Sequence, residues 1–256
     1  MKVISCIIPG LSAARNAGLG LARGRYVCYL DDDAVPAPTW LGRICSAFDA
    51  HPEAAVIGGP ALLRPPSPAP AVLGSGWETY WGHFSVDGDR YREALSWRDY
   101  PWGVNWAARR HDLLEIGGFP LSFGRRPGDF GGGEEHIAAA RLARRGRRIG
   151  IAGDAVVYHH VSADRFTEAH VRETMTARYV TAWRAAQELG ETNHLAIVRT
   201  AVRVALHHID PRVRPLRLFW KDAAFRKTAQ MRLLAAQWRD LRESYRRPLD
   251  EAPVRK

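Results

Sequence analysis

The chain has 256 residues, 46% of them hydrophobic and 25% charged, which is ordinary for a folded soluble protein and ample for a core. No apolar run approaches the roughly 18 residues that a membrane-spanning helix needs, which argues against a transmembrane protein. The three cysteines lack metal-type spacing, so reduced thiols and a cytoplasmic location are the simplest interpretation.

The net charge of +10 is unevenly distributed. Residues 166–256 hold 18 Lys and Arg against 10 Asp and Glu, whereas residues 1–165 are close to balance. A basic surface of this kind attracts nucleic acid, anionic lipid or phosphorylated ligands. A solvated basic helix face explains the same excess, and the composition does not choose between these interpretations.

The first predicted elements are a short strand over residues 3–8, a helix over 10–24 and a buried strand over 25–30. Ser12 stands near the start of that helix, and Gly24 lies past its end. Strand-like and helical patterns continue to alternate in the residues that follow.

Apolar residues at helical spacing predict a helix over 37–52, and residues 54–63 are predicted as one strand before a rigid Pro-rich loop over 64–70. This alternation predicts an α/β fold with a largely parallel sheet, in which ligands sit at the carboxyl ends of strands. From about residue 166 the pattern becomes helical, with stretches predicted over 167–189, 193–208 and 216–246.

Three consecutive aspartates, Asp31, Asp32 and Asp33, follow the strand predicted over 25–30. Adjacent like charges repel, and a hard divalent cation, which prefers carboxylate oxygens, would offset that repulsion. Capping of the next helix is the alternative, but one acid would suffice for it. The stretch therefore favours a metal site.

Two acids, Glu134 and Glu135, stand at the predicted start of a helix, directly after three glycines. Interaction with the helix dipole explains any acid at this position. The same helix end also favours the ionised carboxylate that a general base needs, and the glycines let the backbone approach a ligand. Arg125 and Arg126 lie on the same segment, where they could meet phosphate.

His159 and His160 follow a strand-like run, where a histidine is more often structural. A histidine that completes a site already holding two carboxylates is nevertheless a reasonable metal ligand. Five of the nine tryptophans lie between Trp77 and Trp106; rings can stack on sugars, but we expect most of these in the core.

Four segments in this order resemble the family 2 glycosyltransferases of the GT-A fold. The segments are GLSAARNAGLGLARGRYVCYLDDDAVP, GVNWAARRHDLLEIGGF, GGGEEHIAAARLARRG and AVVYHHVSADRF, which together span residues 10–166. The family normally has further strands and helices before the first of these segments, and those carry the acid that holds the nucleotide base.

The resemblance implies a GT-A-like, Rossmann-like α/β fold with a mixed, mostly parallel sheet and helices on both faces. It implies an N-terminally incomplete domain over residues 1–165, since the usual nucleotide-binding strands are missing before Gly10. Residues 166–256 are expected to form a basic helical C-terminal extension.

The resemblance also implies roles for single residues. Asp31 and Asp33 would be the outer acids of a D-x-D motif that binds Mn²⁺ or Mg²⁺ on the donor diphosphate. His159 matches the metal-side histidine better than His160, because H-x-V-x-x-x-R runs on to Arg165. Glu135 would be the general base that deprotonates the acceptor hydroxyl, at a position where the family usually has Asp.

Donor and substrate contacts are implied for seven further residues: Arg15, Asn16, Asp32, Asn105, Trp106, Gly133 and Glu134. The implied reaction is inverting transfer of a sugar from a nucleotide-sugar donor to a glycan, lipid-linked or small-molecule hydroxyl, as in polysaccharide biosynthesis. The basic C-terminal region would then rest on anionic lipid at the inner face of the cell membrane.

Two other functions compete with this one. A truncated, noncatalytic glycosyltransferase remnant would bind a partner through the sheet edge that its missing strands leave open. A nucleic-acid-binding protein would use the basic C-terminal helices, but that function leaves Asp31–Asp33 and the paired glutamates unexplained, so we expect no nucleic-acid partner.

Overall fold

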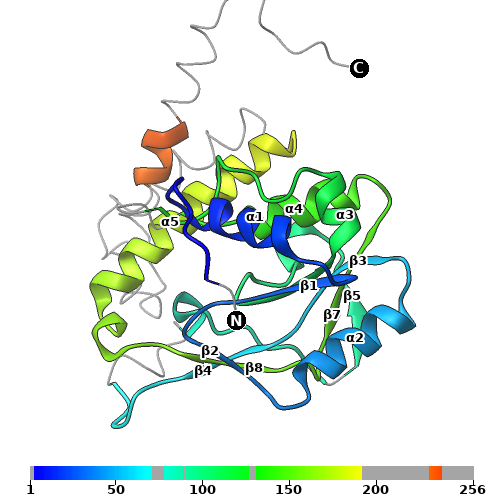
Figure 1. Cartoon of the computed structure of the whole chain (residues 1–256). Coiled ribbons are helices and arrows are strands. Elements are labelled where there is room, and N and C mark those ends of the chain that lie inside the picture. Colours follow the sequence, from blue (N-terminus) through cyan, green and yellow to red (C-terminus); the bar gives the residue numbers. More distant parts are fainter. Residues whose placement is uncertain (1–2, 71–77, 89, 127–130, 192–230, 238–256) are drawn as a thin grey trace, which may run out of the picture. The chain divides into compact units, whose positions relative to one another are not determined.

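The computed structural model describes residues 3–70, 78–88, 90–126, 131–191 and 231–237. The chain divides into two compact units, Met1–Val171 and Arg172–Lys256. The first unit is built from alternating strands and helices (Figure 1).

The elements of the first unit follow one another in this order: α1 (Leu11–Leu21), β1 (Tyr26–Leu30), β2 (Ala34–Pro36), α2 (Trp40–Ala50), β3 (Ala54–Gly58), β4 (Ala61–Arg64), η1 (Glu78–Trp81), β5 (Tyr91–Glu93), η2 (Trp97–Asp99), β6 (Asn105–Arg109), α3 (Arg110–Glu115), α4 (Glu134–Ala143), β7 (Arg148–Ala152), β8 (Val157–His160) and η3 (Ala163–Arg165). The helices predicted over 10–24 and 37–52 and the strand predicted over 25–30 are confirmed as α1, α2 and β1.

The described strands form two sheets. The larger has the order β1-β6-β3-β7-β5, and the smaller has the order β2-β8-β4. Only β3 with β7 and β4 with β8 pair in parallel, and the other four pairings are antiparallel. The mixed α/β architecture is confirmed, but the expectation of a mostly parallel sheet is wrong. Parallel neighbours need a crossover, and the described residues between β4 and β6 form β5 and short 3₁₀ turns instead of a helix.

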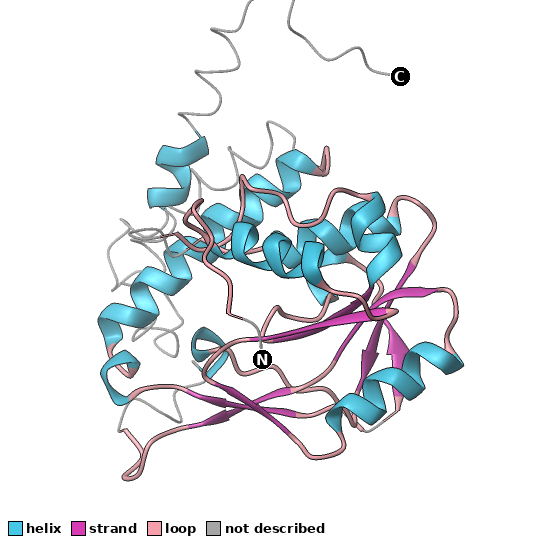
Figure 2. Ribbon diagram, viewed as in Figure 1, coloured by secondary structure: helices cyan, strands magenta, loops and turns pink. Residues whose placement is uncertain are grey.

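Helices cover both faces of the larger sheet, as expected. Figure 2 shows α2 on one face and α1, α3 and α4 on the other. Helix α2 buries Trp40, Ile44 and Phe48 in a core cluster with Ile57 of β3 and Ala107 of β6. Helix α4 packs on β3 and β7 from the opposite face, so its N-terminal residues are held at a defined place above the sheet.

Two local predictions are wrong. Residues 3–8 form no strand, and their side chains are exposed, including Val3 at 85% and Ile7 at 97%. The strand predicted over 54–63 is two strands, β3 and β4, which belong to different sheets. The strand is interrupted at Gly58 and Gly59. An added Cβ on Gly58 would lie only 2.3 Å from Pro101 Cβ, and one on Gly59 only 2.2 Å from the Ala155 carbonyl oxygen. These close approaches require glycine.

Asn105, the first residue of β6, connects the residues around this interruption to α2. Its side chain is 0% exposed. Its Oδ1 accepts from Trp40 Nε1 at 2.8 Å, and its Nδ2 donates to the carbonyls of Pro60 and Ala155 at 2.9 and 2.7 Å. The buried amide therefore links α2 to the two connections between the sheets, from β3 to β4 and from β7 to β8.

We expect Asn105→Ala to lower the free energy of unfolding by about 2–4 kcal/mol, because it strands a buried indole N–H and a buried carbonyl. Urea denaturation followed by tryptophan fluorescence measures this loss. A loss below about 0.5 kcal/mol, the level of an ordinary surface substitution, would contradict the structural role of this amide.

The second unit is described over part of its length. Helix α5 (Glu168–Glu188) begins at the end of the first unit and confirms the helix predicted over 167–189. Residues 231–237 are also helical, and Arg232 pairs with Glu173 of α5 at 3.1 Å. The helix predicted over 193–208, and the remainder of that predicted over 216–246, lie outside the described residues. Within the described ranges, no helix has both the length and the apolarity to cross a membrane.

Candidate active site

The three aspartates form the turn that links the two sheets. Strand β1 ends at Leu30 in the larger sheet, and β2 begins at Ala34 in the smaller one. The turn is closed by a hydrogen bond from the Ala34 N–H to the Asp31 carbonyl, at 3.1 Å. The acids thus stand at the carboxyl end of β1, as expected, and at a junction where side chains from both sheets can meet.

Pairing of β2 with β8 brings Asp33 to the histidines. Ala34 lies opposite His159, and the His160 N–H donates to the Asp33 carbonyl at 2.8 Å. The Asp33 carboxylate lies 3.1 Å from His159 Nε2 and 3.2 Å from Arg165 Nη1. The hydrogen bond with His159, together with the charges of His159 and Arg165, lowers the pKa of Asp33 in spite of its partial burial.

The ring of His159 is held in one orientation. Its Nδ1 lies 2.9 Å from the carbonyl of Trp81, which can only accept, so Nδ1 carries a proton. At Gly82, with φ of +80°, an added Cβ would lie 2.7 Å from the ring. The other ring nitrogen, Nε2, is thereby directed at the oxygen of Asp33 that lies 3.1 Å away.

The carboxylate of Asp31 faces Arg15 of α1. Arg15 is only 7% exposed and donates to Asp31 Oδ1 at 3.3 Å, to Glu134 Oε1 at 2.6 Å and to the Gly103 carbonyl at 3.1 Å. Burial raises the pKa of Asp31, the charges of Asp33 and Glu135 raise it further, and Arg15 opposes them. The acids of the turn and of α4 therefore lie close enough to repel one another.

The paired glutamates open α4, as predicted, after Gly133 with φ of +87°. Glu134 is 1% exposed, and its Oε2 has no hydrogen-bond partner among the described residues. Burial and the charge of Glu135 raise the pKa of Glu134, and Arg15 offsets part of that rise.

Glu135 differs from its neighbour. Its Oε1 accepts from the Gly103 N–H at 3.3 Å and lies 3.2 Å from His136 Nδ1. Burial alone would raise the pKa of Glu135, but contact with His136 and the nearby Arg15 charge hold it below its usual range. Glu135 is therefore ionised at neutral pH, the state in which a carboxylate accepts a proton.

The other predicted contact residues divide into two groups. Asp32 is exposed in the turn, and Gly133 is half-buried at the start of α4. Asn16 is half-buried, and its amide exchanges two 2.8 Å hydrogen bonds with the backbone of Phe119. Asn105 and Trp106 are fully enclosed, at 0% and 1% exposure. Their side chains support the sheet from inside, and contact of either with a ligand stays a prediction.

Sequence reasoning missed the contacts made through the backbone. The carbonyl of Trp81 orients His159, and Gly103 contacts Arg15 through its carbonyl and Glu135 through its N–H. A backbone contact leaves no residue-type signal. The only available hint was the presence of Gly82 and Gly103 themselves, beside two of the tryptophans.

The donor set suits a hard divalent cation. Asp31, Asp33 and His159 offer two carboxylates and an imidazole nitrogen whose lone pair is directed by the Trp81 carbonyl. Among the described residues, His111, Asp112 and Glu115 bring three ligand atoms within 4.8 Å of one another, which Asp31, Asp33 and His159 do not. There, however, Asp112 is paired with Arg147 and Glu115 with Arg145, so two arginine side chains already balance the charges of these acids.

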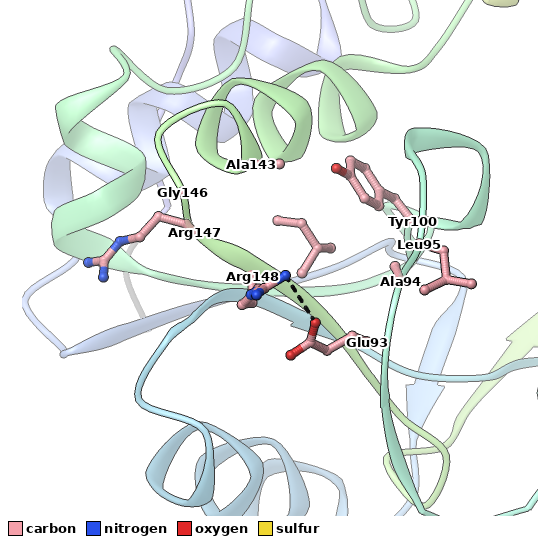
Figure 3. Close-up of a pocket in the computed structure, with 9 residues that line it drawn as sticks. Glu93, Ala94, Leu95, Tyr100, Ala143, Gly146, Arg147 and Arg148 are labelled. Atoms are coloured by element: carbon pink, nitrogen blue, oxygen red, sulfur yellow. Dashed lines mark ion pairs between the residues drawn. The ribbon is translucent and has the colours of Figure 1, made fainter.

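A separate cavity of about 380 Å³ lies at the other end of α4 (Figure 3). It is lined by Glu93, Ala94, Leu95, Tyr100, Ala143, Gly146, Arg147, Arg148 and Ile149, and Arg148 pairs with Glu93 across it at 3.5 Å. None of the acids that gather around Arg15 lines this cavity, so it is distinct from the candidate active site.

Residues 2–64, which include α1 and the aspartate turn, match the family model "Glycosyl transferase family 2". Over these residues the chain resembles the family 2 glycosyltransferases. It is also similar to the glucosyl-dolichyl phosphate glucuronosyltransferase of Haloferax volcanii, with 27% identity over 150 residues. This match covers 59% of the chain but only 45% of that protein, so the chain spans less than half of its curated relative.

Solved structures of glycosyltransferases are similar at a greater distance. The mannosyltransferase PcManGT from Pyrobaculum calidifontis, in complex with GDP-Man and Mn²⁺, is 18% identical with a TM-score of 0.47, covering 91% of this chain and 67% of that one. Residues 1–349 of S. aureus TarS are 14% identical with a TM-score of 0.41, covering 90% of this chain and 72% of that one. At these scores the likeness assigns neither donor nor metal to this chain.

Proposed function

We propose that the chain is an inverting, metal-dependent glycosyltransferase, which moves a sugar from a nucleotide-sugar donor to a hydroxyl acceptor. The observation that carries the proposal is the meeting of Asp31 and the N-terminus of α4 at Arg15, which puts a candidate base beside a candidate metal site. The family 2 match over residues 2–64 supports it, because that match includes Arg15 and the aspartate turn.

Asp31, Asp33 and His159 would hold Mn²⁺ or Mg²⁺. When bound, such an ion neutralises the charge that develops on the leaving nucleoside diphosphate. Asp31 would bind this ion beside its contact with Arg15, and Asp33 would exchange its contact with His159 Nε2 for the ion. The exposed Asp32, at the tip of the turn, would contact the ribose of the donor.

Glu135 would act as the general base. Its carboxylate takes the proton from the acceptor hydroxyl as that oxygen attacks the anomeric carbon of the donor sugar. The new carbon–oxygen bond forms on the face opposite the breaking bond to the diphosphate, so the configuration at the anomeric carbon inverts. Gly133, the residue before α4, would lie beside the acceptor, and the buried Asn105 and Trp106 would support this part of the site from the core.

Calorimetric titration of the purified chain with UDP, GDP and dTDP, with and without Mn²⁺, tests the donor half of the proposal. We expect one nucleotide to bind, and to bind more tightly with the metal. A screen of sugar transfer from the corresponding nucleotide sugars then tests the reaction. A folded chain that binds none of the three nucleotides would contradict the proposed function.

The pH profile of transfer follows from the lowered pKa of Glu135. A base with a lowered pKa stays ionised as the pH falls, so its activity is lost only on the acid side of its folded pKa. We expect kcat to change little between pH 8 and pH 5. A steep fall in kcat between pH 7 and pH 6 would indicate a base with a raised pKa instead, and would argue against Glu135.

Contact with an anionic membrane at the cytoplasmic face is a further part of the proposal, because the acceptor class includes lipid-linked sugars. It is supported by the basic excess over residues 166–256. Sedimentation with vesicles of neutral lipid, with and without phosphatidylserine, tests it. Equal binding to both vesicle types would remove membrane contact from the proposal.

A noncatalytic, partner-binding role is the second candidate. Within the described residues β1 pairs only with β6, so its other edge is open, and the apolar Val3 and Ile7 are exposed. Open edges and exposed apolar side chains favour association. A concentration-dependent oligomer without nucleotide affinity, seen by analytical ultracentrifugation together with the titration above, would favour this candidate.

A further inference from the structure

Arg15 joins three parts of the candidate active site. Its guanidinium contacts Asp31 after β1, the carbonyl of Gly103 before β6, and Glu134 in the first turn of α4. With 7% of the residue exposed, all three contacts are with protein groups. The planar fork of a guanidinium has fixed donor directions, so three such contacts set the relative positions of their partners.

The backbone of Gly103 links Arg15 to Glu135. Its carbonyl accepts from Arg15, and its N–H donates to Glu135 Oε1 at 3.3 Å. An added Cβ on Gly103 would lie 2.7 Å from Arg15 Nη2, so the guanidinium packs directly on this backbone. Displacement of Arg15 would therefore move the peptide that holds the candidate base.

Glu134 makes the network unusual. A buried ion pair is a weak source of stability, because desolvation of both charges offsets their attraction. Here the cost is higher still, since the second oxygen of Glu134 has no hydrogen-bond partner among the described residues and Glu135 adds a like charge. An apolar pair of the same volume would pack α1 on α4 without this cost. The ion pair therefore makes better sense as a geometric constraint than as a stabilising contact.

We propose that Arg15 and Glu134 are positioning residues, which hold the carboxylate of Glu135 at a fixed place relative to Asp31. In this proposal Arg15 does not bind the donor. The inference rests on the proposed function, since Glu135 must be the base. It differs from the role that the sequence resemblance implies, in which Arg15 and Glu134 touch the donor or substrate.

Steady-state kinetics of the whole chain separate the two roles. We expect Glu134→Gln and Arg15→Lys each to lower kcat by about 10- to 100-fold, the scale of a small misplacement of a catalytic group. The KM for the nucleotide sugar should stay within about threefold, because neither residue contributes to donor binding. The double variant should be no slower than the slower single variant, since both changes break one network.

Asp112→Asn is the matched control. Asp112 is a buried acid in an ion pair with Arg147, distant in sequence from the candidate site. We expect this variant to lower Tm and to leave kcat within about twofold, as a purely structural ion pair would. Glu134→Gln keeps the shape of its side chain, so it tests the inference even if Arg15→Lys fails to fold.

Three results would overturn the inference. A raised donor KM with unchanged kcat in Arg15→Lys would make Arg15 a donor ligand. Kinetics of Glu134→Gln like those of Asp112→Asn would make the pair structural. Falls in kcat that multiply in the double variant would mean that the residues act separately. An inactive wild-type chain would instead overturn the proposed function, and the inference with it.

Discussion

Glu135→Gln should lower kcat by about 10²–10⁴-fold, the usual contribution of a general base. The substitution keeps the size of the side chain and its capacity to accept from the Gly103 N–H, but it removes the group that takes the proton. Rates of sugar transfer at saturating donor and acceptor measure this loss. Nucleotide affinity, measured by calorimetry, should stay close to that of the wild type.

The control for this prediction is Glu115→Gln. Glu115 is a half-exposed acid of α3 that pairs with Arg145 at 3.6 Å, and it belongs to no part of the proposed site. Its loss should leave transfer unaffected. If Glu135→Gln retained a tenth or more of the wild-type kcat, another residue would have to be the base, and Glu134 would be the next candidate.

Asp33→Asn should weaken metal-dependent nucleotide binding by at least about 10- to 100-fold. Removal of a residue that merely supports a metal ligand already causes a loss of that size, and Asp33 would be a ligand itself. The amide still contacts His159 and Arg165 but offers the cation a neutral oxygen in place of a charged one. Titration with nucleotide in the presence and absence of Mn²⁺ measures the effect. In the absence of metal, we expect both proteins to bind equally weakly.

Asp49→Asn serves as the control, because Asp49 is an exposed carboxylate that contacts Tyr26 and Arg25 at the surface of the first unit and belongs to no part of the proposed site. Electron paramagnetic resonance of Mn²⁺ provides a reading that does not depend on nucleotide. Unchanged Mn²⁺ binding in Asp33→Asn would remove Asp33 from the metal site and would leave its ion pair with Arg165 as its role.

Short-range patterns in the sequence determined where several helices and strands of this protein lie. The apolar spacing of α1 and α2, the strand before the aspartates and the glycines before Glu134 each act within a few residues, and the structure has these elements where they were predicted. The order of the motifs was sufficient to indicate a family 2 glycosyltransferase, and the family match agrees. The residue types suggested His159 or His160 as a ligand beside the aspartates, and the resemblance selected His159.

Pairing between distant strands was decided by the tertiary structure. The insertion of β6 between β1 and β3, and the separation of β3 from β4 at Gly58 and Gly59, depend on backbone contacts between segments far apart in the chain. Residue type carries little information about such contacts, because any residue offers the same N–H and carbonyl. A pattern of residue types therefore predicted strands but not their partners.

The roles of individual polar side chains were decided in the same way. In the sequence Arg15 and Asn105 are simply a basic and an amide residue within a resembling motif. Folding encloses both, so Arg15 meets Asp31, Glu134 and Gly103, and Asn105 joins Trp40 to two carbonyls. A buried polar group must find its partners inside the protein, and those partners come from whichever segments the fold brings together.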